Sequence, residues 1–165
     1  MVVISHANLV TTKELSELRA EIRKYAPETP IAESYLDPLF FYRARKRARV
    51  PLVKLENQRV TTFSAVGVPR SFQLLLTRQR IRPVRNFEFM DHHVFSKKEL
   101  QEIKAVSDSA SATEIVTTEK DFYRAPEMIS DVINPLVLAA KLRISSGEDL
   151  LNRKIFELTG GINQR

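Results

Sequence analysis

Short β-branched segments alternate with amphipathic helical segments along this chain, and that alternation limits its possible folds more than any other feature. Val2–Ile4 and Arg59–Val66 carry the β-branched residues that favour strands. Leu15, Leu18 and Ile22 are spaced like the apolar face of a helix. Because strands separated by helices are typical of layered proteins, we expect an α/β fold with a mostly parallel sheet and flanking helices.

Local signals place the starts of several helices. Thr11 precedes Glu14, and Ser96 precedes Glu99, by the three-residue spacing of a capping box. Pro69 suits the first turn of another helix, because a proline has no N–H to leave unpaired there. These signals predict helices that begin directly after Thr11, at Pro69 and directly after Ser96.

Positive charge is concentrated in one part of the chain. The net charge is +6, and residues 41–90 hold twelve Lys or Arg against two acids. This stretch includes most of Asp37–Pro51, where the sequence predicts no regular structure. Such asymmetry predicts a face that meets an anionic partner. Nucleic acid, phosphorylated lipid, an acidic membrane surface and a merely solvated face all fit the charge alone.

Three absences narrow the chemistry. The chain has no Cys, which excludes disulfides, thiolate metal sites and Cys nucleophiles. It also has no apolar run of the roughly 18 residues that a transmembrane helix needs. The four glycines do not form the Gly-x-x-x-x-Gly-Lys pattern of a P-loop. We therefore expect no backbone cradle for nucleotide phosphates in this sequence.

Polar residues follow three of the expected strands. Ser5–Asn8, Asp91–His93 and Thr118–Asp121 each come directly after an apolar segment. The carboxyl ends of parallel strands share one edge of a sheet, where ligands bind. A histidine there can exchange a proton near neutral pH, and Lys120 with a Thr hydroxyl could hold a phosphate. The sequence therefore predicts a site at this edge.

Other uses of these residues stay open on sequence grounds. An Asp-His-His triplet could bind a metal, as in a metal-dependent phosphoesterase, although no His-x-x-x-His spacing accompanies it. Asp91–His93 could equally form an ordinary helix entry, and Thr118 an ordinary helix cap. The basic tract from Arg43 to Arg49 could bind nucleic acid, although no known nucleic-acid motif accompanies it.

The order of these motifs resembles that of the tetraacyldisaccharide 4′-kinase family. Ile4–Asn8, Phe63–Phe72, Phe89–Ser96 and Ile115–Asp121 match segments of that family in order and spacing across nearly the whole chain. Asn8 stands where the family usually has Asp. The resemblance implies one α/β unit over residues 1–165, like the carboxy-terminal half of a P-loop-type kinase without its P-loop.

The resemblance also implies a function. It implies phosphoryl transfer from ATP, with Mg²⁺, to the 4′-hydroxyl of a lipid A disaccharide precursor at the cytoplasmic face of the inner membrane. The partners would be this precursor, the anionic membrane surface and the missing P-loop half, with no nucleic acid. ATP and Mg²⁺ would bind only in the complete enzyme, and the chain alone would bind neither and be inactive.

Roles for single residues follow from the same resemblance. His92 would help activate the sugar hydroxyl, and Asp91 would support His92; these two are the candidate catalytic residues. Contacts to substrate or phosphate would come from Lys120, Thr118, Asp121 and Asn8. No residue is expected to bind a metal. The expected face toward anionic lipid consists of Phe40, Phe41, Arg43, Arg45, Lys46, Arg47 and Arg49.

Overall fold

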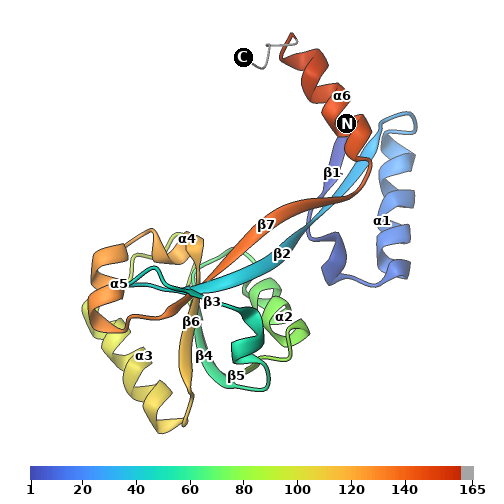
Figure 1. Cartoon of the computed structure of the whole chain (residues 1–165). Helices are drawn as coiled ribbons and strands as arrows, with labels where there is room; N and C mark the ends of the chain where they lie inside the picture. Colours follow the sequence, from blue (N-terminus) through green and yellow to red (C-terminus); the bar gives the residue numbers. More distant parts are fainter. Residues whose placement is uncertain (161–165) are drawn as a thin grey trace. The chain divides into compact units, whose positions relative to one another are not determined.

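The computed structural model describes residues 1–160, and it divides the chain into two compact units. The first unit combines Met1–Asp37 with the residues from Lys141 onward, and the second is Pro38–Ala140. Strand β2 (Ile31–Arg43) leads from the first unit into the second, and β7 (Leu136–Ser146) leads back (Figure 1). The expected single α/β unit over residues 1–165 stays a prediction, and residues 161–165 lie outside the described part.

The described residues form one seven-stranded sheet, in the order β1-β2-β7-β6-β4-β5, with β3 paired to β2. Pairing is parallel for β1 with β2, β4 with β5, β4 with β6 and β6 with β7, and antiparallel for β2 with β3. The expected α/β fold with a mostly parallel sheet is confirmed. The remaining strands are β1 (Val2–Ile4), β3 (Arg49–Val50), β4 (Arg59–Ser64), β5 (Arg82–Glu88) and β6 (Glu114–Thr118).

Helices cover both faces of the sheet in the second unit (Figure 1). One core joins the sheet to α3 (Lys97–Ser109), α4 (Glu119–Phe122) and α5 (Pro126–Val132). The other joins it to α2 (Pro69–Arg78) and the short helix η2 (Leu52–Leu55). β4 after Arg59 and the first four residues of β7 are buried on both faces, as parallel strands usually are, whereas β5 at the edge of the sheet is mostly exposed.

The first unit is thinner. It contains η1 (Ala7–Leu9), α1 (Thr12–Tyr25) and α6 (Glu148–Leu158), and neither α1 nor α6 has a buried residue. Ala32 is fully buried, and the buried Glu33 forms an ion pair with Arg19. Among residues 1–160, no helix has the length and apolar character needed to cross a membrane.

The expected helix starts are present. Thr11 with Glu14, and Ser96 with Glu99, form complete capping boxes, and Pro69 occupies the first turn of α2. Each such cap contributes about 1 kcal/mol to helix stability. Local sequence therefore fixes where these helices begin.

The segment Asp37–Pro51 differs from its prediction, because most of it is strand. β2 continues to Arg43, and Phe41 and Tyr42 pair with Val50 and Arg49 of β3. Phe41 is completely buried in the core beside α2. Burial of these aromatic side chains outweighs the weak local signal, which Pro38 and the Arg-rich sequence obscure.

Candidate functional site

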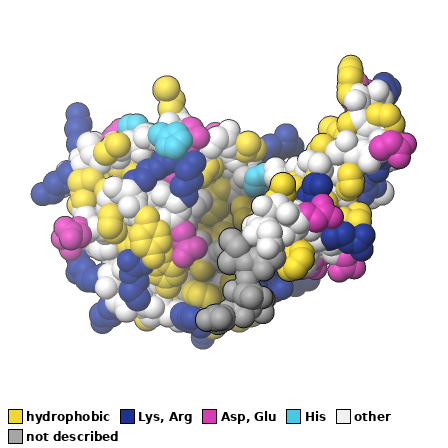
Figure 2. Space-filling view, turned by 90° about the horizontal axis from the view of Figure 1, so that it is seen from above, with side chains coloured by type: hydrophobic (Ala, Val, Ile, Leu, Met, Phe, Trp, Pro, Cys, Tyr) yellow, Lys and Arg dark blue, Asp and Glu magenta, His cyan; other side chains and the backbone are white. Residues whose placement is uncertain are grey.

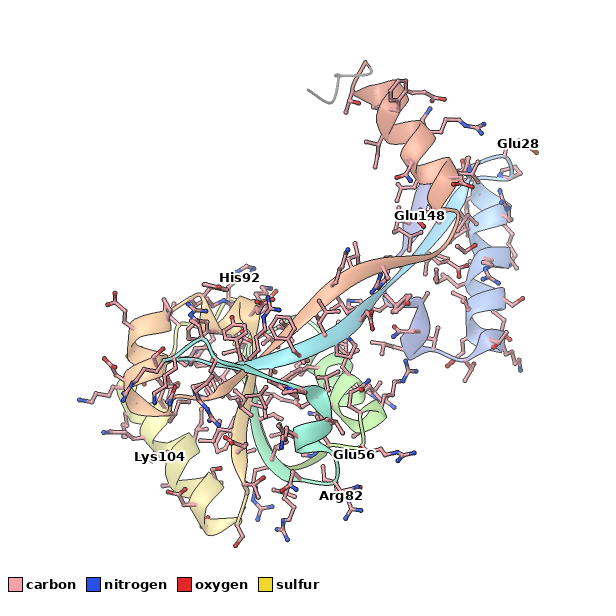
Figure 3. The ribbon with its side chains drawn as sticks, in the orientation of Figure 1. Glu28, Glu56, Arg82, His92, Lys104 and Glu148 are labelled. Atoms are coloured by element: carbon pink, nitrogen blue, oxygen red, sulfur yellow. The ribbon has the colours of Figure 1, made fainter. Side chains whose placement is uncertain are left out.

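Three parallel strands of the second unit end at the same edge of the sheet. β5 and β6 both run parallel to β4, so the segments after Ser64, Glu88 and Thr118 lie together. Figure 3 shows His92 at this end of the unit and Arg82, where β5 begins, at the opposite end. Two of the three polar segments expected to share an edge, 91–93 and 118–121, are therefore neighbours.

The Asp91 carboxylate is the centre of this group. Its Oδ1 accepts hydrogen bonds from Lys120 Nζ at 2.9 Å, from the His92 backbone N–H at 2.9 Å and from Arg124 Nη2 at 3.4 Å. The hydrogen bond from Lys120 is the main reason that the pKa of Asp91 lies below its ordinary value. The bond from the His92 backbone adds to this, so Asp91 is a stable anion at neutral pH.

His92 projects from a left-handed turn. Its φ is +64°, in the left-handed region that is uncommon for a residue other than glycine. The hydrogen bond from its backbone N–H to Asp91 Oδ1 stabilises this turn. The side chain is 80% exposed, and its Nε2 lies 3.6 Å from Asp91 Oδ2. An exposed imidazole beside a carboxylate has the placement that proton transfer to or from a bound ligand requires.

His93 has a structural environment instead. Its Nε2 lies 3.0 Å from Glu99 Oε1, and its ring stacks on Phe89 with centroids 4.6 Å apart. Glu99 also accepts from the Ser96 backbone N–H, so His93 braces the start of α3. The pKa of Glu99 is lowered, first by the Ser96 backbone and then by the Ser96 hydroxyl.

Asp121 is directed into the protein. Its side chain is completely buried, and Oδ1 accepts from the Ala65 N–H at 3.1 Å while Oδ2 accepts from the Thr118 hydroxyl at 2.7 Å. Thr118 in turn accepts from the Asp121 N–H and caps α4. Because its side chain is completely buried, Asp121 cannot make the expected contact with a ligand in this arrangement. The Thr118 hydroxyl caps the N-terminus of α4.

Arg124 belongs to the same group, although it is not among the site residues predicted from the sequence. Its guanidinium donates to Asp121 Oδ1 at 3.2 Å, to Ala65 O at 3.0 Å and to His93 O at 3.4 Å, besides its bond to Asp91. The available signal was the three-residue spacing from Asp121, which places the two side chains together on a helical turn.

Asn8 belongs to the other unit of the chain. It is part of η1, after His6 with a left-handed φ of 56°. Its Oδ1 is buried and accepts no hydrogen bond from any residue in the range 1–160. The structure thus describes Asn8 separately from the group around Asp91.

The expected lipid-facing segment is only partly available at the surface. Phe41 is fully buried, so it cannot contact a membrane, because β2 places it in the core. Arg43 forms a two-pronged bond to Glu114, with distances of 2.6 and 2.8 Å, and Arg45 pairs with Asp131 at 3.4 Å. Lys46 has no hydrogen bond or ion pair to any described residue.

Aromatic rings hold the other two arginines of this segment. The Arg47 guanidinium lies 4.6 Å from the Phe122 ring centroid, and its Nη1 donates to the Tyr123 hydroxyl at 3.3 Å. Arg49 lies over Phe40 at 4.5 Å. Arg47 thereby brings the basic turn against Phe122 of α4. In the second unit, Figure 2 shows histidine side chains directly beside Lys and Arg side chains.

Exposed apolar side chains border the charged group. The Cβ that Gly67 lacks would stand 3.6 Å from Asp91 Oδ2, which brings the 65–68 loop to the site. Several large hydrophobic side chains next to site residues in the sequence are exposed: Val68, Met90, Val94 and Tyr123. A polar centre with apolar neighbours suits a ligand that has both characters. Within residues 1–160, no three His, Asp or Glu side chains form a metal-binding cluster.

Comparison with known proteins gives a consistent family. A family model described as LpxK, tetraacyldisaccharide-1-P 4′-kinase, matches residues 2–158. The tetraacyldisaccharide 4′-kinase of Elusimicrobium minutum (strain Pei191) is 26% identical over 151 residues, covering 90% of this chain and 39% of that protein. The tetraacyldisaccharide 4′-kinase of Afipia carboxidovorans is 33% identical over 106 residues, covering 61% of this chain and 31% of that protein.

A solved structure is also similar. The crystal structure titled as the "apo" form of LpxK from Aquifex aeolicus in complex with ATP aligns with a TM-score of 0.49 and 17% identity, over 95% of this chain and 51% of that one. The chain spans well under half the length of the two curated relatives above.

Proposed function

Because the chain belongs to the tetraacyldisaccharide-1-P 4′-kinase family, we propose that it contributes to phosphoryl transfer from ATP to the 4′-hydroxyl of a lipid A disaccharide 1-phosphate precursor. The convergence of Asp91, His92 and Lys120 at one edge of the sheet carries this proposal. These residues form the acceptor side of the reaction, where the sugar hydroxyl is held and loses its proton.

His92 takes the proton of the sugar hydroxyl. Its ring is exposed, and the Asp91 carboxylate lies 3.6 Å from Nε2, so a bound hydroxyl can reach the ring. Asp91 keeps this role at neutral pH because Lys120 and the His92 backbone stabilise its charged form.

Lys120 supplies positive charge beside the reacting groups. Its side chain is about half exposed, and its ammonium is anchored to Asp91 at 2.9 Å. Catalysis of phosphoryl transfer depends mainly on positioning and on stabilising charge. A lysine held by one carboxylate and open to solvent can do both for a phosphate that approaches this edge.

The apolar neighbours of the site support a lipid acceptor. Val68, Met90 and Val94 are all more than half exposed. Hydrophobic side chains of this size beside a charged centre would contact acyl chains while the sugar reaches His92. The same surface, together with Lys46 and Arg45, would hold the protein against the anionic cytoplasmic face of the inner membrane.

The chain itself does not fit the phosphates of ATP. Gly67, Gly147, Gly160 and Gly161 are its only glycines, and no P-loop pattern includes them. We propose that residues outside these 165 bind ATP and Mg²⁺ in the active enzyme. The 165-residue chain alone then transfers no phosphate.

A chimera tests this function. The matching segment of the Elusimicrobium kinase is replaced by this chain, and 4′-phosphate formation is measured with ATP and the disaccharide precursor. The chimera should be active, and His92→Gln should lower kcat by about 10²- to 10⁴-fold, the contribution of a positioned general base. Gln101→Ala, on the exposed surface of α3, is the matched control.

Two results would contradict the proposal. One is full activity of the His92→Gln chimera with a normal unfolding temperature. The other is ATP-dependent phosphorylation of the precursor by the purified 165-residue chain, which would overturn the assignment of the ATP site to other residues.

A further inference from the structure

Arg124 makes more connections than any other side chain of the candidate site. It is only 15% exposed, and it donates to four acceptors in three segments. These are Ala65 O after β4, His93 O and Asp91 Oδ1 after β5, and Asp121 Oδ1 in α4. A planar guanidinium with five N–H donors is suited to such a junction, whereas an ammonium is not.

The junction is rigid because its own support is buried. Asp121, which pairs with Arg124 at 3.2 Å, is completely buried and also bonds to Ala65 and Thr118. Buried charges are retained where they are paired and fully hydrogen-bonded. Nη1 of Arg124 is therefore held by buried or partly buried acceptors, and Nη2 donates to the exposed Asp91.

The donors around Asp91 are distributed unequally between its two oxygens. Lys120, Arg124 and the His92 backbone all bond to Oδ1. Within residues 1–160, Oδ2 accepts no hydrogen bond, and the His92 ring lies 3.6 Å from it. The donors thus fix the rotation of the carboxylate so that Oδ2 faces the imidazole.

We propose that Arg124 is a positioning residue that fixes the Asp91 carboxylate, so that Oδ2, 3.6 Å from Nε2, electrostatically favours the Nε2–H form of the His92 ring and leaves Nδ1 free to accept a proton. This inference rests on the proposed function only for its use in catalysis. Lys120 supplies charge to the same oxygen, but its side chain is half exposed, whereas that of Arg124 is only 15% exposed. Orientation comes from Arg124, and charge comes from Lys120.

The test measures the ring tautomer of His92 in the 165-residue chain by ¹⁵N NMR, at a pH high enough for the imidazole to be neutral. In the unmodified chain, the Nε2–H form should dominate. Arg124→Lys keeps the charge but cannot reach all four acceptors. The ratio of Nε2–H to Nδ1–H should then fall about fivefold, as the loss of one modest electrostatic contact of about 1 kcal/mol predicts.

Two further variants make the test specific. Arg59→Lys is the matched control, because Arg59 also donates to a backbone carbonyl but lies at the start of β4. It should leave the His92 ratio unchanged. Lys120→Met removes the exposed cation and should also leave the ratio largely unchanged, because Arg124 and the backbone N–H still hold Oδ1.

The outcomes separate this inference from the proposed function. An unchanged ratio in a folded Arg124→Lys chain would overturn the inference, even if the chimera is active. A fivefold fall in Lys120→Met would overturn it too, since Lys120 would then be the positioning group. If Arg124→Lys does not fold, the tautomer ratio in Lys120→Met alone decides whether Lys120 is the positioning group. The tautomer measurement needs no phosphoryl transfer. A fall of the ratio in Arg124→Lys would therefore support the inference even if the chimera were inactive.

Discussion

The Lys120 ammonium lies 2.9 Å from Oδ1 of Asp91, and this ion pair connects α4 to the segment that follows β5. It is the largest cause of the lowered pKa of Asp91. Lys120→Met should therefore raise the pKa of Asp91 toward its ordinary value. A ¹³C NMR titration of the Asp91 carboxyl measures this directly. Lys104→Met, on the exposed surface of α3, is the control that changes net charge equally.

The same ion pair predicts a pH dependence of stability. Because folding lowers the pKa of Asp91, its contribution to stability is present above the pKa of the unfolded chain. It is lost as the pH falls through the lower pKa of the folded state. Urea unfolding between neutral and strongly acidic pH should thus show a smaller acid-induced loss in Lys120→Met than in Lys104→Met. Equal losses in both variants would contradict the pairing.

Asp121 predicts a large effect on stability. Asp121→Ala leaves the Ala65 N–H without its acceptor and Arg124 without its buried partner. Breaking a buried pair on one side costs about 3–5 kcal/mol, so the free energy of unfolding should fall by that amount in urea titrations. Asp108→Ala, at an exposed position of α3, should change it by about 0.5 kcal/mol or less. A small effect of Asp121→Ala would mean that the site is not built on this residue.

The capping box at Ser96 gives a smaller, linked pair of effects. Ser96→Ala removes the hydroxyl that accepts from Glu99 N–H and donates to the Glu99 carboxylate. Stability should fall by about 1 kcal/mol, and the pKa of Glu99 should rise toward its ordinary value, because one of its two Ser96 bonds is lost. Ser109→Ala, at the other end of α3, should leave the pKa of Glu99 unchanged.

Local sequence signals were sufficient for the helix starts and for the common edge of the strand ends. Thr11 and Ser96 cap as predicted because their hydroxyls and the Glu three residues later lie within one turn. The juxtaposition of Asp91 with Lys120 also follows from topology, since parallel strands end together. No long-range contact had to be known for either prediction.

Burial decided the features that the sequence did not show. Because arginines follow Phe41, the sequence predicts that it belongs to an exposed basic tract. In the structure Phe41 lies in β2, and the alternation of side chains along this strand directs it into the core. Asp121 reads as a ligand contact beside Lys120, yet a short helix directs the two side chains apart, one inward and one outward.

The basic turn between β2 and β3 gives the last prediction. Arg45 is more than half exposed, and Lys46 has no ion pair within the described residues, whereas Arg43 is held by Glu114. If this turn meets anionic lipid, the double variant Arg45→Gln/Lys46→Gln should weaken binding of the chain to phosphatidylserine vesicles. Each basic residue near such a surface contributes about 1 kcal/mol, so the loss should be roughly tenfold or more.

A matched pair on α3 separates a specific face from net charge. Lys97→Gln/Lys104→Gln removes the same two charges from an exposed helix of the same unit. It should weaken vesicle binding far less, and binding by the unmodified chain should fall as salt screens the charges. Equal losses in the two double variants would show that only net charge matters. No loss in Arg45→Gln/Lys46→Gln would remove the basic turn from the membrane-facing surface, because Arg43, Arg47 and Arg49 are already held by Glu114 and by aromatic rings.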